Sequence, residues 1–181
     1  CSNKENRMPT SEQTIVKRVT ELVAADSVSS PDPSWDSSNR RVINHLYDYA
    51  ERDGWAVDIH ELESTADGKA NLIATLGNAD NLGDEPAGLV LSGHTDTVPF
   101  DAGGWASDPL KLTERDGKPY GLGSTDMKGF FAVTLEAASV FDPAKFKAPL
   151  YLLATADEES TMRGARSLTK AHGPLATAAI D

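Results

Sequence analysis

The sequence has 181 residues, enough for one domain with a sizeable core and too few for two large ones. Hydrophobic residues make up 39% and charged residues 25%, which is typical of a soluble globular protein. The net charge of −11 argues against nucleic acid and anionic membrane as partners, because both attract a basic surface.

The sequence contains one cysteine, Cys1, so no internal disulfide bond is expected. Cys1 would suit the start of a mature lipoprotein, but the sequence shows no leader peptide, and Met8 is an alternative start. No apolar run is long enough to span a bilayer. We therefore expect residues 1–10 to be a disordered polar lead, residues 11–181 to be the folded part, and the location to be cytoplasmic.

Two amphipathic helices are expected first. Ser11 should cap the first, Asp36 or Ser37 the second, and Gly54 should end the second. Apolar residues then recur at helical spacing in each of them. The two apolar stripes consist of Ile15, Val16, Val19, Leu22 and Val23, and of Val42, Ile43, Leu46, Tyr49 and Ala50.

Strands and helices alternate in the rest of the sequence. Strands are predicted at 55–62, 71–76, 88–92, 149–156 and 178–181, and helices at 127–140 and 162–171. The segment Val98–Gly117 is predicted to be a long ordered loop, anchored by Trp105 and ending in a tight turn. This alternation predicts an α/β fold with a mixed, mostly parallel sheet.

The ends of the predicted strands carry the residues with catalytic potential. His94 and Asp96 follow one strand, and residues two apart in an extended chain face the same side. Glu158 and Glu159 follow another strand, and Asp126 lies in a glycine-rich loop. Ligands of open α/β sheets bind beyond the carboxyl ends of the strands, so we expect these residues to converge on a metal site.

Imidazole and carboxylates without thiolates suit zinc, cobalt or manganese. We expect His94 to bind one ion, Asp126 to bridge two ions and Glu159 to bind the second. Asp96 is placed to accept a hydrogen bond from the non-ligating ring nitrogen of His94. Glu158 remains as the general base for the attacking water, and afterwards as the acid that protonates the leaving amine.

Several motifs together resemble the dinuclear zinc aminoacylase/carboxypeptidase family. They are His94–Pro99, Trp105 with Asp108-Pro109, Gly117–Gly123, Asp126–Gly129 and Ala156–Glu159, and the resemblance covers nearly all of residues 11–181. It implies a three-layer α/β/α sandwich with a smaller dimerising lid domain in the complete, homodimeric protein. It also implies hydrolysis of a small-molecule N-acyl amino acid.

The same resemblance assigns the site residues. It implies metal ligands at His94, Asp126 and Glu159, a base at Glu158 and a helper at Asp96. The ions would be two divalent cations, zinc first and cobalt second, and the family often has a cis peptide bond after the bridging aspartate.

The family pattern continues with a Gly-Glu-Pro segment and a distant histidine, which would supply one further ligand to each ion. The sequence ends at Asp181, where that glutamate is expected, and His172 is a poor substitute. We therefore expect the N-terminal part of such an enzyme, with an incomplete metal site and no activity by itself.

Two alternatives stay open. A related desuccinylase, aminoacylase or metallopeptidase would carry the same motifs, and a catalytically inactive remnant would keep the fold as a binding module. The presence of Glu158 favours a catalytic protein, while the acyl group is not fixed by these residues.

Overall fold

The computed structural model describes residues 11–63, 68–78, 88–172 and 178–180, so the predicted polar lead at 1–10 lies outside the described residues. The helices are α1 (Ser11–Ala24), α2 (Arg40–Arg52), α3 (Lys128–Ala138) and α4 (Arg163–His172), with short 3-10 turns at Ala102–Gly104 and Pro143–Lys145. The strands are β1 (Ala56–Glu61), β2 (Ala70–Leu76), β3 (Leu89–His94), β4 (Thr113–Arg115), β5 (Lys118–Tyr120), β6 (Leu150–Thr155) and β7 (Ala178–Ile180).

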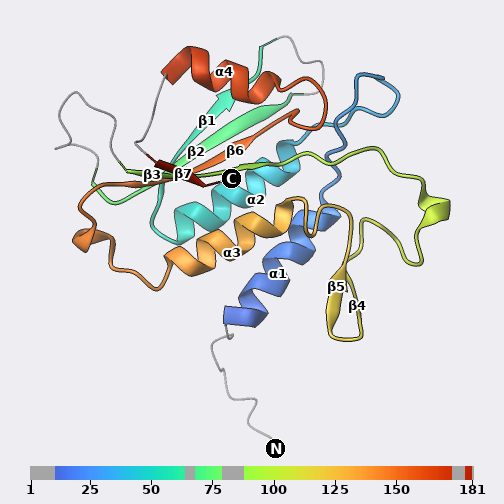
Figure 1. The fold of residues 1–181 in the computed structure, drawn as a ribbon, viewed down its shortest axis with the longest axis horizontal. Helices are drawn as coiled ribbons and strands as arrows, with labels where there is room; N and C mark the ends of the chain where they lie inside the picture. Colours follow the sequence, from blue (N-terminus) through green and yellow to red (C-terminus); the bar gives the residue numbers. More distant parts are fainter. Residues whose placement is uncertain (1–10, 64–67, 79–87, 173–177, 181) are drawn as a thin grey trace, which may run out of the picture.

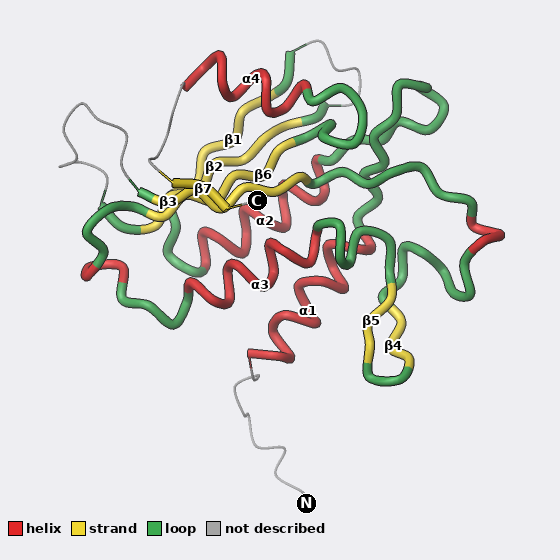
Figure 2. The backbone as a smooth tube through the Cα atoms, in the orientation of Figure 1, coloured by secondary structure: helices red, strands yellow, loops and turns green. Residues whose placement is uncertain are grey.

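Five of these strands form one sheet in the order β1-β2-β6-β3-β7 (Figures 1 and 2). β3 runs parallel to β6 and β7, whereas the β1–β2 and β2–β6 pairs are antiparallel. The prediction of a mixed sheet is confirmed, with the described pairings divided equally between the two kinds. β3 extends to His94, two residues further than expected, because Gly93 and His94 continue the pairing with Ala154 and Thr155.

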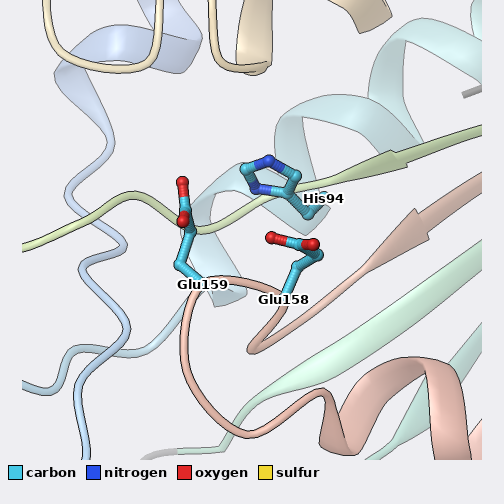
Figure 3. A group of neighbouring side chains, drawn as sticks. All are labelled: His94, Glu158 and Glu159. Atoms are coloured by element: carbon cyan, nitrogen blue, oxygen red, sulfur yellow. The ribbon is translucent and has the colours of Figure 1, made fainter.

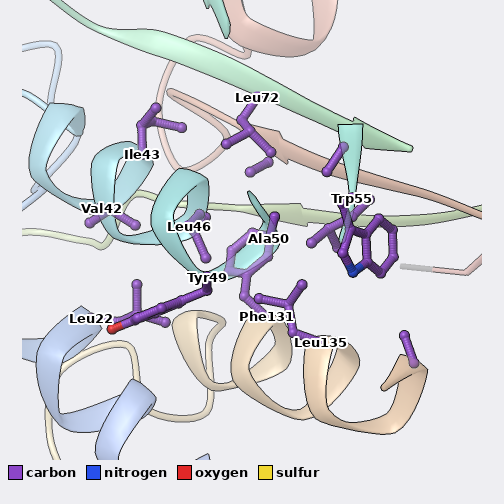
Figure 4. Close-up of a cluster of buried hydrophobic side chains, with 14 of the residues drawn as sticks. Leu22, Val42, Ile43, Leu46, Tyr49, Ala50, Trp55, Leu72, Phe131 and Leu135 are labelled. Carbon is purple, nitrogen blue, oxygen red and sulfur yellow. The ribbon is translucent and has the colours of Figure 1, made fainter. Parts of the chain in front are cut away.

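Helices cover both faces of the sheet and make three layers. α2 and α3 lie on one face, α1 packs against α3, and α4 lies on the other face (Figure 1). The main core lies between the sheet and the α2–α3 layer (Figure 4). Its fully buried members include Ile43, Leu46, Leu72, Phe131 and Leu135. This arrangement confirms the expected α/β/α sandwich.

The two N-terminal helices use the predicted apolar stripes with one exception. Val16 is 46% exposed, whereas the charged residue Arg18, two positions later, is buried. The Arg18 guanidinium donates to Asp53 Oδ2 at 2.7 Å and lies over the Tyr49 ring. A charged side chain tolerates this burial because it is paired.

Gly54 ends α2 as predicted, with φ of 85° directly after the C-cap residue Asp53, but the predicted N-terminal caps are not the observed ones. Ser11 is the first residue of α1, and α2 is preceded by Asn39 rather than capped by Asp36 or Ser37. Asn39 donates from Nδ2 to the main-chain oxygen of Ala70 at 2.7 Å and accepts the main-chain N–H of Ala70 at Oδ1 at 3.0 Å. The Asn39 side chain thus joins the start of α2 to β2, so a tertiary contact replaces local capping here.

The long segment after β3 contains a hairpin that was not predicted, β4–β5. Its turn is the expected one, because Asp116 and Gly117 both have positive φ, 53° and 70°. Trp105 is half-buried. No helix in the described part of the chain is long and apolar enough to cross a membrane.

Gly164 at the start of α4 is a position where a methyl group should not fit. A Cβ atom there would overlap the main chain of Ala156 and the side-chain oxygen of Asn71. We expect Gly164→Ala to destabilise the fold by about 1–3 kcal/mol, the usual cost of overpacking. Thermal unfolding measures this, and Gly104→Ala is the matched control because open space surrounds that glycine. Equal melting temperatures for the two variants would show that α4 is not tightly docked.

Candidate metal centre

A cleft of about 430 Å³ lies at the carboxyl ends of β3 and β6. His94, the last residue of β3, enters it from one side, and Glu158 and Glu159 enter from the loop after β6. Asp126 comes from the loop before α3. The other lining residues are Ser92, Gly93, Met127, Thr155, Met162 and Ala165. The parallel pairing of β3 and β6 therefore brings together residues more than sixty positions apart in the sequence.

The ligand atoms of three side chains converge at one point. One atom each of His94, Glu158 and Glu159 lies within 4.8 Å of the others, and Figure 3 shows both glutamates beside the imidazole. His94 Nε2 lies 3.1 Å from Asp126 Oδ1. The Asp126 side chain is 76% exposed, whereas that of His94 is 7% exposed. His94 therefore lies at the buried bottom of the cleft, and Asp126 lies at its solvent-exposed edge.

The chemistry of this donor set fits a divalent cation. Imidazole nitrogen and carboxylate oxygen are ligands for zinc and related metals. Nδ1 of His94 lies 3.1 Å from the main-chain oxygen of Asp96, so the Nδ1–H donates there and Nε2 is the nitrogen left to bind a metal ion in the cleft. This is the tautomer that a metal ligand requires.

Asp96 differs from its expected role. The acceptor for His94 is its main-chain carbonyl, and its carboxylate lies 3.8 Å from Nδ1. The carboxylate instead accepts the main-chain N–H of Glu158 at 3.2 Å and that of Glu159 at 3.0 Å. Asp96 therefore holds the loop that carries both glutamates, a contact that residue spacing does not reveal.

Two carboxyl groups at the cleft, those of Asp96 and Glu159, have raised pKa values. Burial raises the pKa of Asp96, although the amide hydrogen bonds and the nearby His94 act in the opposite direction. Burial also raises the pKa of Glu159, with further contributions from Asp126 and the other nearby carboxylates. Carboxylates in such a site repel one another, so a bound cation would stabilise their ionised forms.

The structure adds a buried lysine that the sequence interpretation did not single out. Lys128, at the start of α3, is fully buried and donates to the main-chain oxygen of Ala25 at 2.7 Å. Burial lowers the pKa of Lys128 to about 8, although the negative charges of Asp26 and Asp96 act to raise it. The peptide bond between Asp126 and Met127 is cis, as the resemblance implied.

Replacing Asp96 by asparagine should disturb the site without unfolding the protein. Asparagine keeps the shape but offers one acceptor oxygen to two main-chain N–H groups. In the protein at its natural length we expect metal affinity or kcat to fall by about 10–100-fold, the usual effect of a group that orients a ligand. Calorimetry and steady-state kinetics measure both quantities, with Asp142→Asn as an exposed control outside the cleft. Unchanged affinity and kinetics would assign Asp96 no role.

Known proteins are similar to this chain over most of its length. Acetylornithine deacetylase of Vibrio campbellii is 49% identical over 149 residues, which are 82% of this chain and 37% of that protein. The enzyme of the same name from Photorhabdus laumondii is 51% identical over 146 residues, or 81% and 36%. The chain thus spans little more than a third of the length of these relatives.

Solved structures share the fold. Human carnosine dipeptidase 1 matches with a TM-score of 0.71 at 24% identity, over 91% of this chain and 37% of that one. The di-peptidase Dug1p of Saccharomyces cerevisiae matches with a TM-score of 0.70 at 20% identity, over 93% and 38%. At these identities the likeness concerns the fold alone.

The sequence profile of peptidase family M20/M25/M40 matches residues 90–181. The match begins in β3 and includes every residue that lines the cleft. The motifs that suggested a metallohydrolase all lie within this matched segment. By this match over half of its length, the chain belongs to peptidase family M20/M25/M40.

Proposed function

We propose that the protein at its natural length removes the acetyl group from N2-acetylornithine, giving ornithine and acetate for arginine biosynthesis. The observation that carries this proposal is the identity of about 50% to acetylornithine deacetylases over four fifths of the chain. Residues 97–101 and 126–132 also resemble that enzyme more closely than a desuccinylase. A metal-dependent hydrolysis accords with the histidine and carboxylates of the cleft.

In this proposal His94, Asp126 and Glu159 would hold two divalent ions, with zinc preferred and cobalt able to replace it. When bound, such ions polarise the amide carbonyl and lower the pKa of a water. Glu158 takes a proton from the water that attacks the carbonyl carbon. As the carbon–nitrogen bond breaks, Glu158 gives this proton to the departing amine. Asp96 keeps both glutamates in place through their main-chain N–H groups.

The remaining properties are part of the same proposal. Residues 11–181 form the N-terminal part of the catalytic domain, and the protein at its natural length is a cytoplasmic homodimer with a separate lid domain. Its partner is a small N-acyl amino acid rather than nucleic acid or a membrane, in keeping with the net charge of −11.

The 181-residue chain by itself is expected to bind metal weakly and to show no turnover. A catalytic zinc site normally has three protein ligands and a water. His94, Asp126 and Glu159 give each of two ions only two ligands, even when Asp126 serves both. Titration with Zn²⁺ or Co²⁺ by calorimetry, with an assay on N2-acetylornithine, tests this expectation. Tight binding of two ions together with turnover would contradict it.

A panel of substrates tests the proposed specificity. N2-acetylornithine should give the highest kcat/KM, ahead of N-succinyl-diaminopimelate, other acetylated amino acids and a dipeptide. Preference for the succinyl compound or the dipeptide would identify the related desuccinylase or peptidase instead. A protein that binds acetylornithine without hydrolysing any of the four would be the non-catalytic binding module.

A further inference from the structure

A buried ion pair involves the residue that directly precedes the two glutamates in the chain. Lys69, just before β2, donates from Nζ to Asp157 Oδ1 at 2.6 Å, and Asp157 is the residue before Glu158. The two side chains are 2% and 1% exposed. Lys69 also donates to Asp36 Oδ1 at 2.6 Å. Charges this deeply buried are costly unless they are paired, so the pair must form whenever the chain folds.

Asp157 is held by more than this lysine. Its carboxylate also accepts from Ser29 Oγ at 3.0 Å and from Arg163 Nε at 2.8 Å. Burial alone raises the pKa of Asp157, but the hydrogen bonds from Lys69 and Arg163 outweigh it and leave the pKa lowered. The carboxylate is therefore an ionised anchor. The backbone at Asp157 has φ of 61°, a left-handed conformation that a side chain rarely adopts without such support.

The anchor fixes the direction of the residues that follow. Asp157 points away from the cleft into its buried partners, and the next two main-chain N–H groups donate to Asp96. Three successive residues are thus held by the side chains of Lys69 just before β2, of Asp96 in the loop after β3 and of Arg163 in α4. The carboxylates of Glu158 and Glu159 are left to face His94 (Figure 3).

We propose that Lys69, through its ion pair with Asp157, is a positioning residue for the carboxylates of Glu158 and Glu159. Its importance for catalysis rests on the proposed function, whereas its effect on the loop does not. Lys69 does not line the cleft. Its route to the two glutamates is Asp157, the residue that precedes them in the chain.

The test compares Lys69→Met with Asp36→Asn in the protein at its natural length. The methionine fills similar space without the charge and leaves Asp157 without its lysine partner. Asp36→Asn changes the second carboxylate that accepts from the same Lys69 Nζ and leaves the pair with Asp157 in place, so it is the matched control. Amide hydrogen exchange of residues 157–162 reports the loop, and kcat with KM reports the active site.

For Lys69→Met we expect faster exchange at the amides of Glu158 and Glu159, and a kcat about 10–100-fold lower with little change in KM. Asp36→Asn should leave both quantities near wild type. If Lys69→Met does not fold, Asp157→Asn carries the test, because it keeps the shape and removes the charge. Wild-type exchange and kcat in the folded variant would overturn the proposal, as would equal effects in the Asp36→Asn control.

The two proposals fail in different ways. If wild-type protein hydrolyses none of the four substrates, the proposed function fails, but the exchange measurement still decides whether Lys69 positions the loop. If wild type is active and Lys69→Met exchanges and turns over normally, only the positioning role fails.

Discussion

In the protein at its natural length, Glu158→Gln is expected to lower kcat by about 10²–10⁴-fold, the usual contribution of a positioned general base. Glutamine keeps the size and the hydrogen-bonding shape of the side chain but cannot take a proton from water. Metal content should stay near that of wild type, because in this account Glu158 is not a ligand. Steady-state kinetics and metal analysis of the same preparation measure the two quantities together.

The matched variant is Glu159→Gln, one residue further along the same loop. It should lose metal as well as activity, because Glu159 is assigned as a ligand. The geometry alone does not decide which glutamate is the ligand and which the base, since one ligand atom of each lies within 4.8 Å of a ring nitrogen of His94. Loss of metal in Glu158→Gln and its retention in Glu159→Gln would reverse the two assignments.

His94→Ala should have the second large effect. It removes the nitrogen around which the carboxylates gather and leaves them without a buried partner. Metal affinity should fall by more than the roughly 10–100-fold that loss of an orienting group costs, and turnover should fall with it. Titration with Co²⁺, followed by its visible absorption, measures the affinity.

His45→Ala is the control for this substitution, because His45 lies on α2 beside the Tyr49 ring and outside the cleft. It should leave metal binding unchanged. Wild-type affinity in His94→Ala would remove His94 from the site and, with it, the expected centre.

The sequence predicts most of the fold because its patterns are strong. The helical spacing around Leu46 and the apolar strand that contains Leu152 correspond to buried positions in α2 and β6. The N-terminal cap predicted for α2 was wrong because Asn39 and Asp36 bond β2 and Lys69, and such contacts depend on the folded chain. The short β4–β5 hairpin was missed because neither strand has an apolar side, and both are largely exposed.

The site is predictable at the level of its members and less so at the level of their contacts. The strand-end rule brings His94 and Glu159 to one cleft, as expected. The carboxylate of Asp96, however, holds main-chain N–H groups instead of the imidazole. Lys69 gave no signal at all, because a lone lysine in sequence is usually solvated and only the fold places it against Asp157.

The most direct test of the central claim is metal reconstitution of the protein at its natural length. The protein is stripped with a chelator, assayed with N2-acetylornithine, and assayed again during titration with Zn²⁺ or Co²⁺. We expect no turnover from the stripped protein, and activity that returns as two ions bind per chain. Full activity after complete removal of metal, or two ions bound with no hydrolysis of any substrate in the panel, would contradict the account.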